Sequence, residues 1–458
     1  MTLMFIYMTT MTSMMSRKSK KMSKQMMLMS SGMMMMPTLY DWNELNVYYT
    51  TDGMGDMLML LTGYLLPMSM MSNWNNMKNM LYYELMLMLG MMLMMNFMCQ
   101  DMMSFYMYFE VSLMPLFMMM SLYGAKNKNK AADYMLMYTL FSSLFMLLGI
   151  AMYELLMNNT DYLSTSLLVL SLDLQCILFL ALSMGMIVKT PLAPLHTWLP
   201  VVHSESPLAG SMLLAGVMLK LAVYAMIRLM LPTLSDASLL YTPLMYILCL
   251  MTMMYTSLMT LRQTDLKVIM AYSSMSHMAM TILGMFSNYL TGISGSLILS
   301  LAHGLVSPAL FIMVGGILYD RYHNRLIHYF QGLLSYMPTL ATYLIILSFC
   351  NTGTPLSLNF IGELLSLSGT LNNSPILGSL ATTSVTLSAC YQMKLTNRLT
   401  GGLKSPYISL TSDCTFREHF LLLSTIIPTI FFGLFPNFLL NIIFESSNLI
   451  YSFGVYHP

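Results

Sequence analysis

The chain has 458 residues, of which 57% are hydrophobic and only 9% are charged, and its formal net charge is +1. Soluble domains carry about 25% charged residues, so this chain lacks the polar side chains needed to cover a soluble globule of its size. The composition excludes a soluble enzyme domain, and so small a net charge gives no sign of a nucleic-acid partner.

Apolar segments close to the roughly 20 residues that span a bilayer recur along the whole chain. They predict an all-α polytopic membrane protein of about fourteen transmembrane helices, near residues 1–16, 25–39, 54–72, 79–99, 101–121, 131–153, 166–190, 207–230, 239–260, 264–287, 290–318, 337–371, 375–393 and 420–443. Near the N-terminus the basic residues follow the apolar run. A secretory signal has them before it, so we expect the first helix to be retained.

Cysteine and methionine usage indicates no redox or metal chemistry. The six cysteines show no CxxC spacing, which argues against a disulfide framework or an iron–sulfur cluster. The 60 methionines are densest in residues 1–160 and show no ligand-like spacing. We interpret them as replacements for Leu and Ile at lipid-facing positions, typical of organelle genomes that read an extra codon as Met.

The loop charges test the helix count. Every Lys and Arg except Lys189, Lys220 and Arg228 falls in an odd-numbered loop, while the even-numbered loops hold mainly acids. The positive-inside rule then predicts that the odd loops lie inside and both termini outside. A wrong helix count would scramble this alternation.

Several ionisable residues lie where the bilayer is expected. Lys220, for example, is about thirteen residues into its helix, roughly 20 Å deep at 1.5 Å per residue. The set is Glu110, Lys189, Lys220, His277, His303 and Glu363. Such a group costs several kcal/mol and usually faces a partner or a wet cavity. Because burial disfavours the charged form of each, these groups suit proton transfer along a polar line through the middle of the membrane.

Two of these residues lie beside interruptions of an apolar run. Lys189 is followed by Pro191 and Pro194, and Glu363 follows the segment 351–355, which holds Asn, Gly and Pro. Proline removes a backbone donor and frees a carbonyl four residues earlier. We therefore predict broken helices at spans 7 and 12, which a membrane tolerates where the backbone lines a cavity. Breaks at comparable positions in two halves are typical of transporters with inverted repeats.

For single residues, roles other than proton transfer stay open. One buried Glu–Lys pair could simply hold two helices together. A mid-span histidine could bond two helices, and two of them could ligate haem, although no duplicated histidine pair with small neighbours is present. His196 and His203 are expected in an interfacial loop, where structural and functional roles are equally open.

Five motifs occur in this order: YFEVSLMPLF, MIVKTPLAPLHTWLPVVHSESPLAGSMLLAGVMLK, LRQTDLKVIMAYSSMSHM, LAHGL and NFIGEL. Together they resemble the chain 4 family of NADH–ubiquinone oxidoreductase, the mitochondrially encoded antiporter-like subunits of respiratory complex I. The resemblance covers about residues 52–444. It implies N-terminal helices 1–3 in residues 1–78, two inverted five-helix repeats in 79–230 and 239–395, and a matrix loop with the last helix in 396–458.

The resemblance also implies roles for the buried residues. Glu110 and Lys189 match the family's coupled ion pair on helices 5 and 7, and Lys220 matches its central lysine on helix 8. Glu363, in the GEL motif, matches the helix-12 acid near the exit to the outer side. The two mid-span histidines match polar links along the central axis.

The implied function is proton translocation driven by NADH oxidation and ubiquinone reduction elsewhere in the complex. This chain is expected to hold no redox centre, cofactor or metal, while FMN, iron–sulfur clusters, NADH and ubiquinone would bind other subunits. The implied partners are other membrane subunits of complex I, including the neighbouring antiporter-like chains 2 and 5, and membrane lipids, with no nucleic acid. The implied location is the mitochondrial inner membrane, with both termini on the intermembrane-space side.

Relatives of the same fold provide the alternatives. Chains 2 and 5 have lysine at the position of Glu363, which favours the chain 4 family. A stand-alone cation/proton antiporter subunit is the main competing function, and a passive membrane scaffold is the other. A scaffold does not explain six ionisable groups at similar depth.

Overall fold

The computed structural model describes residues 52–74, 80–166 and 170–455. The helices expected at 1–16 and 25–39 lie outside the described residues. Within the described ranges, ten helical segments are long and apolar enough to cross a membrane, and the only β-pairing is two isolated bridges. The all-α polytopic class is thereby confirmed.

The helices follow the predicted spans closely. In the first half they are α3 (Gly53–Ser72), α4 (Met80–Met98), α5 (Met102–Val111), α6 (Leu113–Tyr123), α7 (Lys128–Met157), α8 (Tyr162–Ser166), α9 (Leu172–Lys189), α10 (Trp198–Glu205), α11 (Leu208–Leu213), η2 (Leu214–Met218), α12 (Leu219–Ala225), η3 (Met226–Met230) and α13 (Leu231–Thr233). The elements from α11 to α13 form one continuous span, in which η2 and η3 are π-helical turns.

The second half begins at α14. Its helices are α14 (Ser235–Arg262), α15 (Leu266–Met285), α16 (Leu290–Phe311), η4 (Ile312–Leu318), α17 (Tyr319–Tyr322), η5 (Ile327–Tyr329), α18 (Leu333–Tyr336), α19 (Pro338–Asn351), α20 (Leu358–Asn373), α21 (Pro375–Thr400), α22 (Phe416–Leu434) and α23 (Asn437–Val455). The elements α16, η4 and α17 again form one span.

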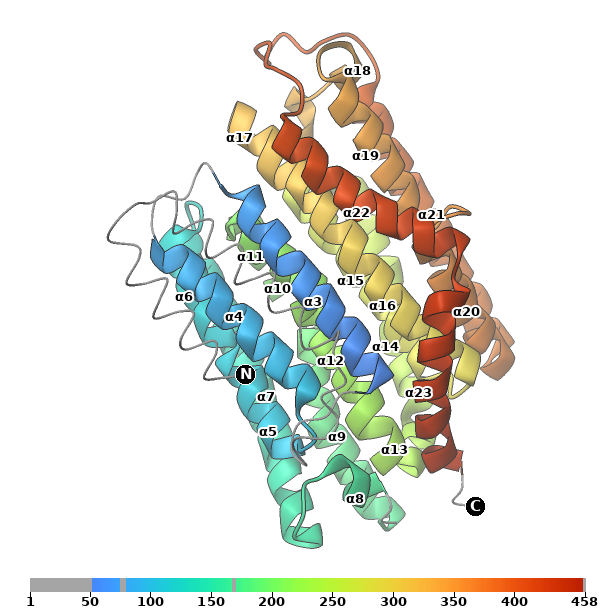
Figure 1. The fold of residues 1–458 in the computed structure, drawn as a ribbon. Helices are drawn as coiled ribbons and strands as arrows, with labels where there is room; N and C mark the ends of the chain where they lie inside the picture. The colour runs from blue at the N-terminus through green and yellow to red at the C-terminus, as the bar shows by residue number, and fades with distance from the viewer. Residues whose placement is uncertain (1–51, 75–79, 167–169, 456–458) are drawn as a thin grey trace.

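Successive spans alternate in direction, so the loops gather at two ends. In Figure 1, α17 and α18 lie at one end, and α8 and the C-terminus lie at the other. Three odd-numbered loops meet at the first end, where the Ala125 N–H donates to the Glu205 carbonyl at 2.8 Å and Arg325 lies 3.8 Å from the Glu205 carboxylate. This arrangement agrees with the alternation of basic and acidic loops. The compartment that each end faces stays a prediction.

Both predicted helix breaks are present. Span 7 divides into α9 and α10 after Lys189, and span 12 divides into α19 and α20 between Asn351 and Leu358. Two further breaks were not predicted. Span 5 is interrupted at Ser112, because Pro115 has no N–H and its ring disturbs the carbonyl four residues earlier. The single helix expected over 420–443 is two helices, α22 and α23, which meet at Pro436.

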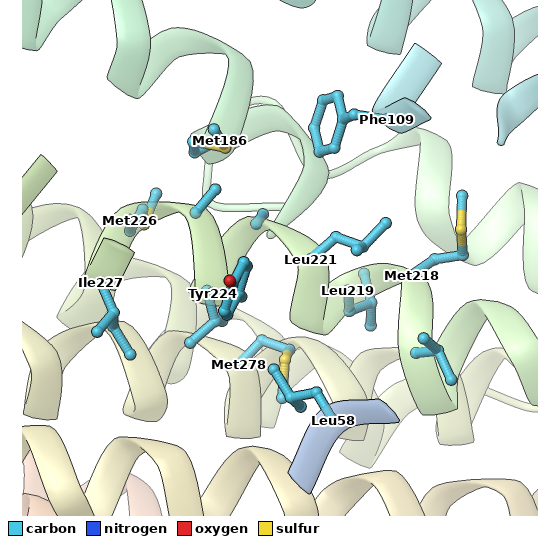
Figure 2. Packing of buried hydrophobic residues seen from close by; sticks show 14 of the residues in the cluster. Leu58, Phe109, Met186, Met218, Leu219, Leu221, Tyr224, Met226, Ile227 and Met278 are labelled. Carbon is cyan, nitrogen blue, oxygen red and sulfur yellow. The ribbon is translucent and has the colours of Figure 1, made fainter. Parts of the chain in front are cut away.

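The spans that carry the buried histidines and Lys220 lie deepest in the molecule. Every residue in the most apolar stretch of Leu290–Tyr322 is buried, and nearly every one in Leu208–Thr233. Figure 2 shows Leu219, Leu221 and Tyr224 of α12 enclosed by apolar side chains from other helices. In contrast, α7 leaves most of its apolar side chains exposed. Lys220, His277 and His303 are therefore enclosed by side chains of other helices.

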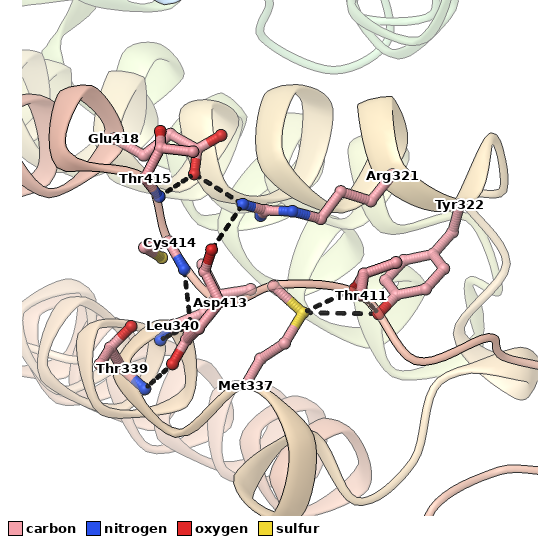
Figure 3. A network of polar contacts seen from close by, with 10 residues as sticks. All are labelled: Arg321, Tyr322, Met337, Thr339, Leu340, Thr411, Asp413, Cys414, Thr415 and Glu418. Carbon is pink, nitrogen blue, oxygen red and sulfur yellow. Dashed lines mark hydrogen bonds and ion pairs between the residues drawn. The ribbon is translucent and has the colours of Figure 1, made fainter.

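We call the end with α17 and α18 the odd-loop end and the end with α8 the even-loop end (Figure 1). The loop after α21 is held at the odd-loop end by Asp413 (Figure 3). Its carboxylate accepts hydrogen bonds from the backbone N–H groups of Thr339 at 2.9 Å and Leu340 at 3.3 Å, in the first turn of α19. Arg321 donates to the Asp413 carbonyl at 3.0 Å and to Glu418 at 2.7 Å. Burial opposes ionisation of this carboxyl, but the hydrogen bonds outweigh it and lower the pKa of Asp413.

Candidate functional site

A buried Glu–Lys pair joins spans 5 and 7. The Lys189 Nζ lies 3.9 Å from Glu110 Oε1 and donates to the Phe109 carbonyl at 3.2 Å. It also lies over the Phe109 ring. The two Glu110 carboxylate oxygens accept no hydrogen bond from any described residue. The pair is thus held by charge and by contacts of the lysine alone, an arrangement that leaves the Glu110 carboxylate free to change partners.

Three of the last carbonyls of α9, before the break, accept hydrogen bonds. The Thr190 N–H and hydroxyl both donate to the Met186 carbonyl at 2.9 Å. The Leu192 N–H donates to the Ile187 carbonyl at 3.1 Å, and the Trp198 indole donates to the Val188 carbonyl at 3.0 Å. Because polar backbone inside a membrane must be satisfied by protein or water, these bonds stabilise Lys189 at the end of a half-helix.

The second cluster is centred on Lys220. Its Nζ lies 2.8 Å from His303 Nδ1 and donates to the Ala215 carbonyl within the π-helical turn η2. Such turns insert one residue and free a carbonyl, and they often occur at functional sites. The contact requires a close approach of η2 and α16. A Cβ on Gly216 would lie 2.4 Å from the Leu65 side chain, and one on Gly304 would lie 3.1 Å from the Gly216 carbonyl.

The chain of polar residues continues to span 12. The rings of His303 and His277 have centroids 5.7 Å apart, and His277 Nδ1 lies 3.5 Å from Glu363 Oε1. The turn between α19 and α20 packs against the same carboxyl. Gly353 has φ +66°, and a Cβ there would lie only 2.2 Å from Glu363 Oε2. Only glycine therefore fits this turn without displacing the Glu363 carboxyl.

The structure brings the six predicted residues into two groups rather than one line. Glu110 and Lys189 form a pair, while Lys220, the two histidines and Glu363 form a contiguous series. No hydrogen bond joins Lys189 to Lys220 in the described part of the chain. A cavity of about 20 Å³, lined by Lys189, Trp198 and Met218, lies beside Lys189. That space admits about one water molecule. Figure 2 shows the apolar side chains of Phe109, Leu219 and Leu221 in this region.

Two polar residues are placed differently from the sequence prediction. His203 is not in an interfacial loop: it lies on α10, is fully buried, and stacks on Phe311 with neither ring nitrogen bonded to a described residue. Lys267 is not a loop residue but lies in the first turn of α15, buried, with its Nζ donating to the Ser206 carbonyl at 3.2 Å. His203 lies close enough to Lys220 and Lys267 to interact with the charges of both. The sequence alone did not reveal this, because it depends on how the helices pack.

His196 and Arg228, which the sequence analysis also singled out, lie at the edges of the site. His196 is buried in the turn after the span-7 break, with its ring edge against Tyr255. Arg228 pairs with Asp52 at the even-loop end. Among the described residues, no group of three or more His, Cys, Asp or Glu side chains is arranged to hold a metal ion.

Comparisons with known proteins agree with this architecture. Residues 99–388 match the family model described as NADH:quinone oxidoreductase/Mrp antiporter, TM. The chain is 69% identical to NADH-ubiquinone oxidoreductase chain 4 of Debaryomyces hansenii, over 100% of this chain and 98% of the relative. It is 64% identical to the chain 4 of Candida albicans, over 99% and 98%.

Two solved structures share the fold. A chain of respiratory complex I from Thermus thermophilus with bound NADH matches with a TM-score of 0.87 and 24% identity, over 94% of this chain and 95% of that one. A chain of the Mrp complex from Dietzia matches with a TM-score of 0.87 and 15% identity, over 98% and 95%. At these identities the likeness shows the fold, and it does not distinguish the two kinds of complex.

Proposed function

The chain belongs to the NADH:quinone oxidoreductase/Mrp antiporter family of membrane proteins, and from this premise we propose that it is a proton-translocating membrane subunit of respiratory complex I. The curated relatives favour complex I over the other kind of complex that shares the fold, because two relatives 69% and 64% identical to this chain are NADH-ubiquinone oxidoreductase chain 4 proteins, covered along nearly their whole length. A stand-alone cation/proton antiporter has only the fold in its favour.

The observation that carries the proton-transfer proposal is the buried series from Lys220 to Glu363. Each member lies within hydrogen-bond distance of the next or one water away, and all are shielded from lipid. Lys220 would receive a proton and pass it to His303 Nδ1 when that nitrogen is unprotonated. His303 and His277, whose Nε2 atoms have no partner among the described residues, would pass it on to the Glu363 carboxylate.

The Glu110–Lys189 pair would control this series by charge. When Lys189 is protonated and close to Glu110, its positive charge is neutralised by the carboxylate. If the pair separates, the unneutralised ammonium raises the cost of a second positive charge at Lys220, which favours proton release toward His303. The loose 3.9 Å contact and the unbonded Glu110 oxygens support a pair that can open.

The finer assignments are part of the same proposal. NADH oxidation and ubiquinone reduction, with FMN and iron–sulfur clusters, would take place in other subunits, and this chain would carry no redox centre. It would pack against other antiporter-like chains and lipids in the mitochondrial inner membrane, with its odd loops in the matrix. The two broken helices support inverted repeats over 79–230 and 239–395.

Replacement of Glu110 by Gln tests this function. In membranes that carry Glu110→Gln, we would record NADH oxidation with quinone and proton uptake by a quenched pH dye in the same sample. Loss of both, with the complex still assembled, is the expected result. Asp173→Asn is the matched control, because Asp173 is an exposed acid at the start of α9. Unchanged rates in Glu110→Gln would make the buried carboxylate structural and would refute its control of the Lys220 series.

A further inference from the structure

A basic cavity of about 230 Å³ lies at the odd-loop end, between the last turns of α14 and α21. Three cationic side chains stand in its wall: Arg262 of α14, and Lys394 and Arg398 of α21. His328 of η5 and apolar residues such as Ile269 complete the lining, and no described Asp or Glu takes part in it. One water molecule needs only about 10–15 Å³ of such space, so the cavity has room for an anionic group that displaces several waters.

Hydrogen bonds between distant segments fix the walls of this cavity. The Lys394 Nζ donates to the Leu261 carbonyl at 2.8 Å, which ties the end of α21 to the end of α14. The Ile327 N–H donates to the Thr264 carbonyl at 2.8 Å, which ties the loop around η5 to the segment after α14. The cavity is therefore formed before any ligand enters, and a ligand would pay little for ordering it.

The three cations of the cavity differ from other basic residues at the same end. Arg321 lies 2.7 Å from the Glu418 carboxylate, and Arg325 lies 3.8 Å from that of Glu205. In the part of the chain that the structure describes, no ion pair joins any of the three cavity cations to an acid. A cation in the last turn of a helix interacts favourably with the helix dipole, which accounts for either arginine alone. It does not account for like charges from two helices around one acid-free cavity, because they repel unless an anion lies between them.

An exposed apolar stripe runs along α14 to this cavity. Its members recur every three or four residues and so share a helix face with Arg262. They are Leu240, Leu244, Ile247, Met251, Tyr255 and Leu258, each between 42% and 63% exposed. From Met251 to Arg262 the helix rises about 16 Å at 1.5 Å per residue, close to half of the roughly 30 Å hydrocarbon core. The part of the stripe beside the cavity thus has the length of the acyl layer of one leaflet.

We propose that this cavity binds the phosphate of an anionic phospholipid from the leaflet at the odd-loop end, with the acyl chains on the exposed stripe of α14. Arginine donates paired hydrogen bonds to phosphate oxygens, and Lys394 adds a point charge. Basic pockets between transmembrane helices suit such headgroups. Inorganic phosphate would satisfy the cations but leave the stripe uncovered. Phosphatidylcholine carries a quaternary ammonium beside its phosphate, which three nearby cations disfavour. The inference requires only that the chain spans a membrane, and it does not depend on proton transfer.

The first test uses the assembled complex without substitution, purified in a neutral detergent. Phosphatidylglycerol with a diazirine in one acyl chain is added and irradiated, and the labelled peptides are identified by mass spectrometry. We expect label between Met251 and Arg262, and we expect unlabelled phosphatidylglycerol to compete where phosphatidylcholine and inorganic phosphate do not. Equal competition by inorganic phosphate would assign the cavity to the free anion, and equal competition by phosphatidylcholine would make the label a general lipid contact. Either result, or the absence of label because a protein neighbour covers α14, overturns the proposal.

The second test removes two of the charges, in the double variant Arg262→Gln/Arg398→Gln. Labelling of α14 should fall by at least about tenfold, because each basic residue beside an anionic lipid contributes to its binding. Arg262→Lys/Arg398→Lys keeps the charges and should retain most of the label. The matched control is Lys126→Gln/Lys130→Gln, which removes two exposed cations at the same end but outside the cavity.

The control should leave the labelling unchanged. An equal loss in the two Gln variants would make the effect one of general charge at this end, and unchanged labelling in Arg262→Gln/Arg398→Gln would show that the cavity does not hold the headgroup. Both results overturn the site. If the Arg262→Gln/Arg398→Gln complex does not assemble, the competition in the unsubstituted complex decides.

Discussion

Replacement of Gly353 by Ala should displace the Glu363 carboxyl while leaving the fold intact. Gly353 has φ +66°, where an L-residue costs about 1–2 kcal/mol. The new Cβ would lie 2.2 Å from Glu363 Oε2. Van der Waals contact requires more than 3 Å, so the carboxyl must retreat by roughly 1 Å. It can do so because it is the flexible end of a long side chain.

The retreat breaks a contact that is already long. His277 Nδ1 and Glu363 Oε1 are 3.5 Å apart, at the limit for a hydrogen bond, so a further 1 Å ends the interaction. Misplacement by about 1 Å can cost a reacting pair up to ~100-fold in rate, and we expect at least a tenfold loss of coupled proton transfer. Assembly should persist, since the backbone strain is small compared with the packing of the surrounding helices.

The assay compares two glycines with left-handed backbone. Gly402→Ala is the control, because Gly402 has φ +84° and a Cβ there would meet the flexible end of the Gln331 side chain in an exposed loop. Quinone-dependent NADH oxidation and dye-reported proton uptake are measured in both variants. NADH oxidation with a soluble acceptor gives the amount of assembled complex. Equal coupled rates in the two variants would refute the claim that the span-12 turn positions Glu363.

Three further perturbations have defined outcomes. Lys220→Gln should reduce coupled proton uptake by at least about tenfold, as general acid–base groups contribute ~10²–10⁴-fold; normal uptake with intact His303 would exclude Lys220 from the relay. Asp413→Ala should lower local stability by about 1 kcal/mol, because the first turn of α19 loses a carboxylate acceptor for its N–H groups, and limited proteolysis of the adjoining loop should become faster. Because the folded-state pKa of Asp413 is lowered, its stabilisation is present above its unfolded pKa and is lost as pH falls through the lower folded value. At the even-loop end, the hydrogen bond with Asp161, burial and repulsion raise the pKa of Asp101 to about 6. The protonated Asp101 therefore stabilises the folded state at acid pH, and this stabilisation is lost as the pH rises through about 6. Asp161→Asn removes the repelling carboxylate, so it should increase thermal stability more at pH 8 than at pH 5. An equal change at both pH values would contradict the interaction between the two carboxyls.

Local signals in the sequence were enough to identify the buried chemistry. A lysine or glutamate inside a long apolar run is costly unless it is used, so Glu110, Lys220 and Glu363 were recognisable one residue at a time. The two predicted helix breaks were equally local, because proline and glycine act on their own backbone. These signals depend on composition and spacing along one helix, and they need no knowledge of neighbours.

The sequence predictions were wrong where the packing of neighbouring helices determines whether a residue is buried. Lys267 was assigned to a loop because it lies at the very start of a predicted span, and contacts with η4 and with the Ser206 carbonyl bury it. His203 follows three prolines, as loop residues often do, yet α10 continues the broken span and buries it against Phe311.

The sequence by itself determined the class of the protein, the approximate position of most helices in the described part of the chain, the two predicted helix breaks and the six candidate ionisable residues. Only the tertiary structure decided which residues are in contact. Lys220 meets His303, 83 positions later, while Lys189 pairs with Glu110 on another helix. The physical reason is that burial cost is a property of one side chain, whereas pairing depends on which helix faces approach closely. That approach is set by small residues such as Gly216 and Gly304, whose effect appears only when two distant helices cross.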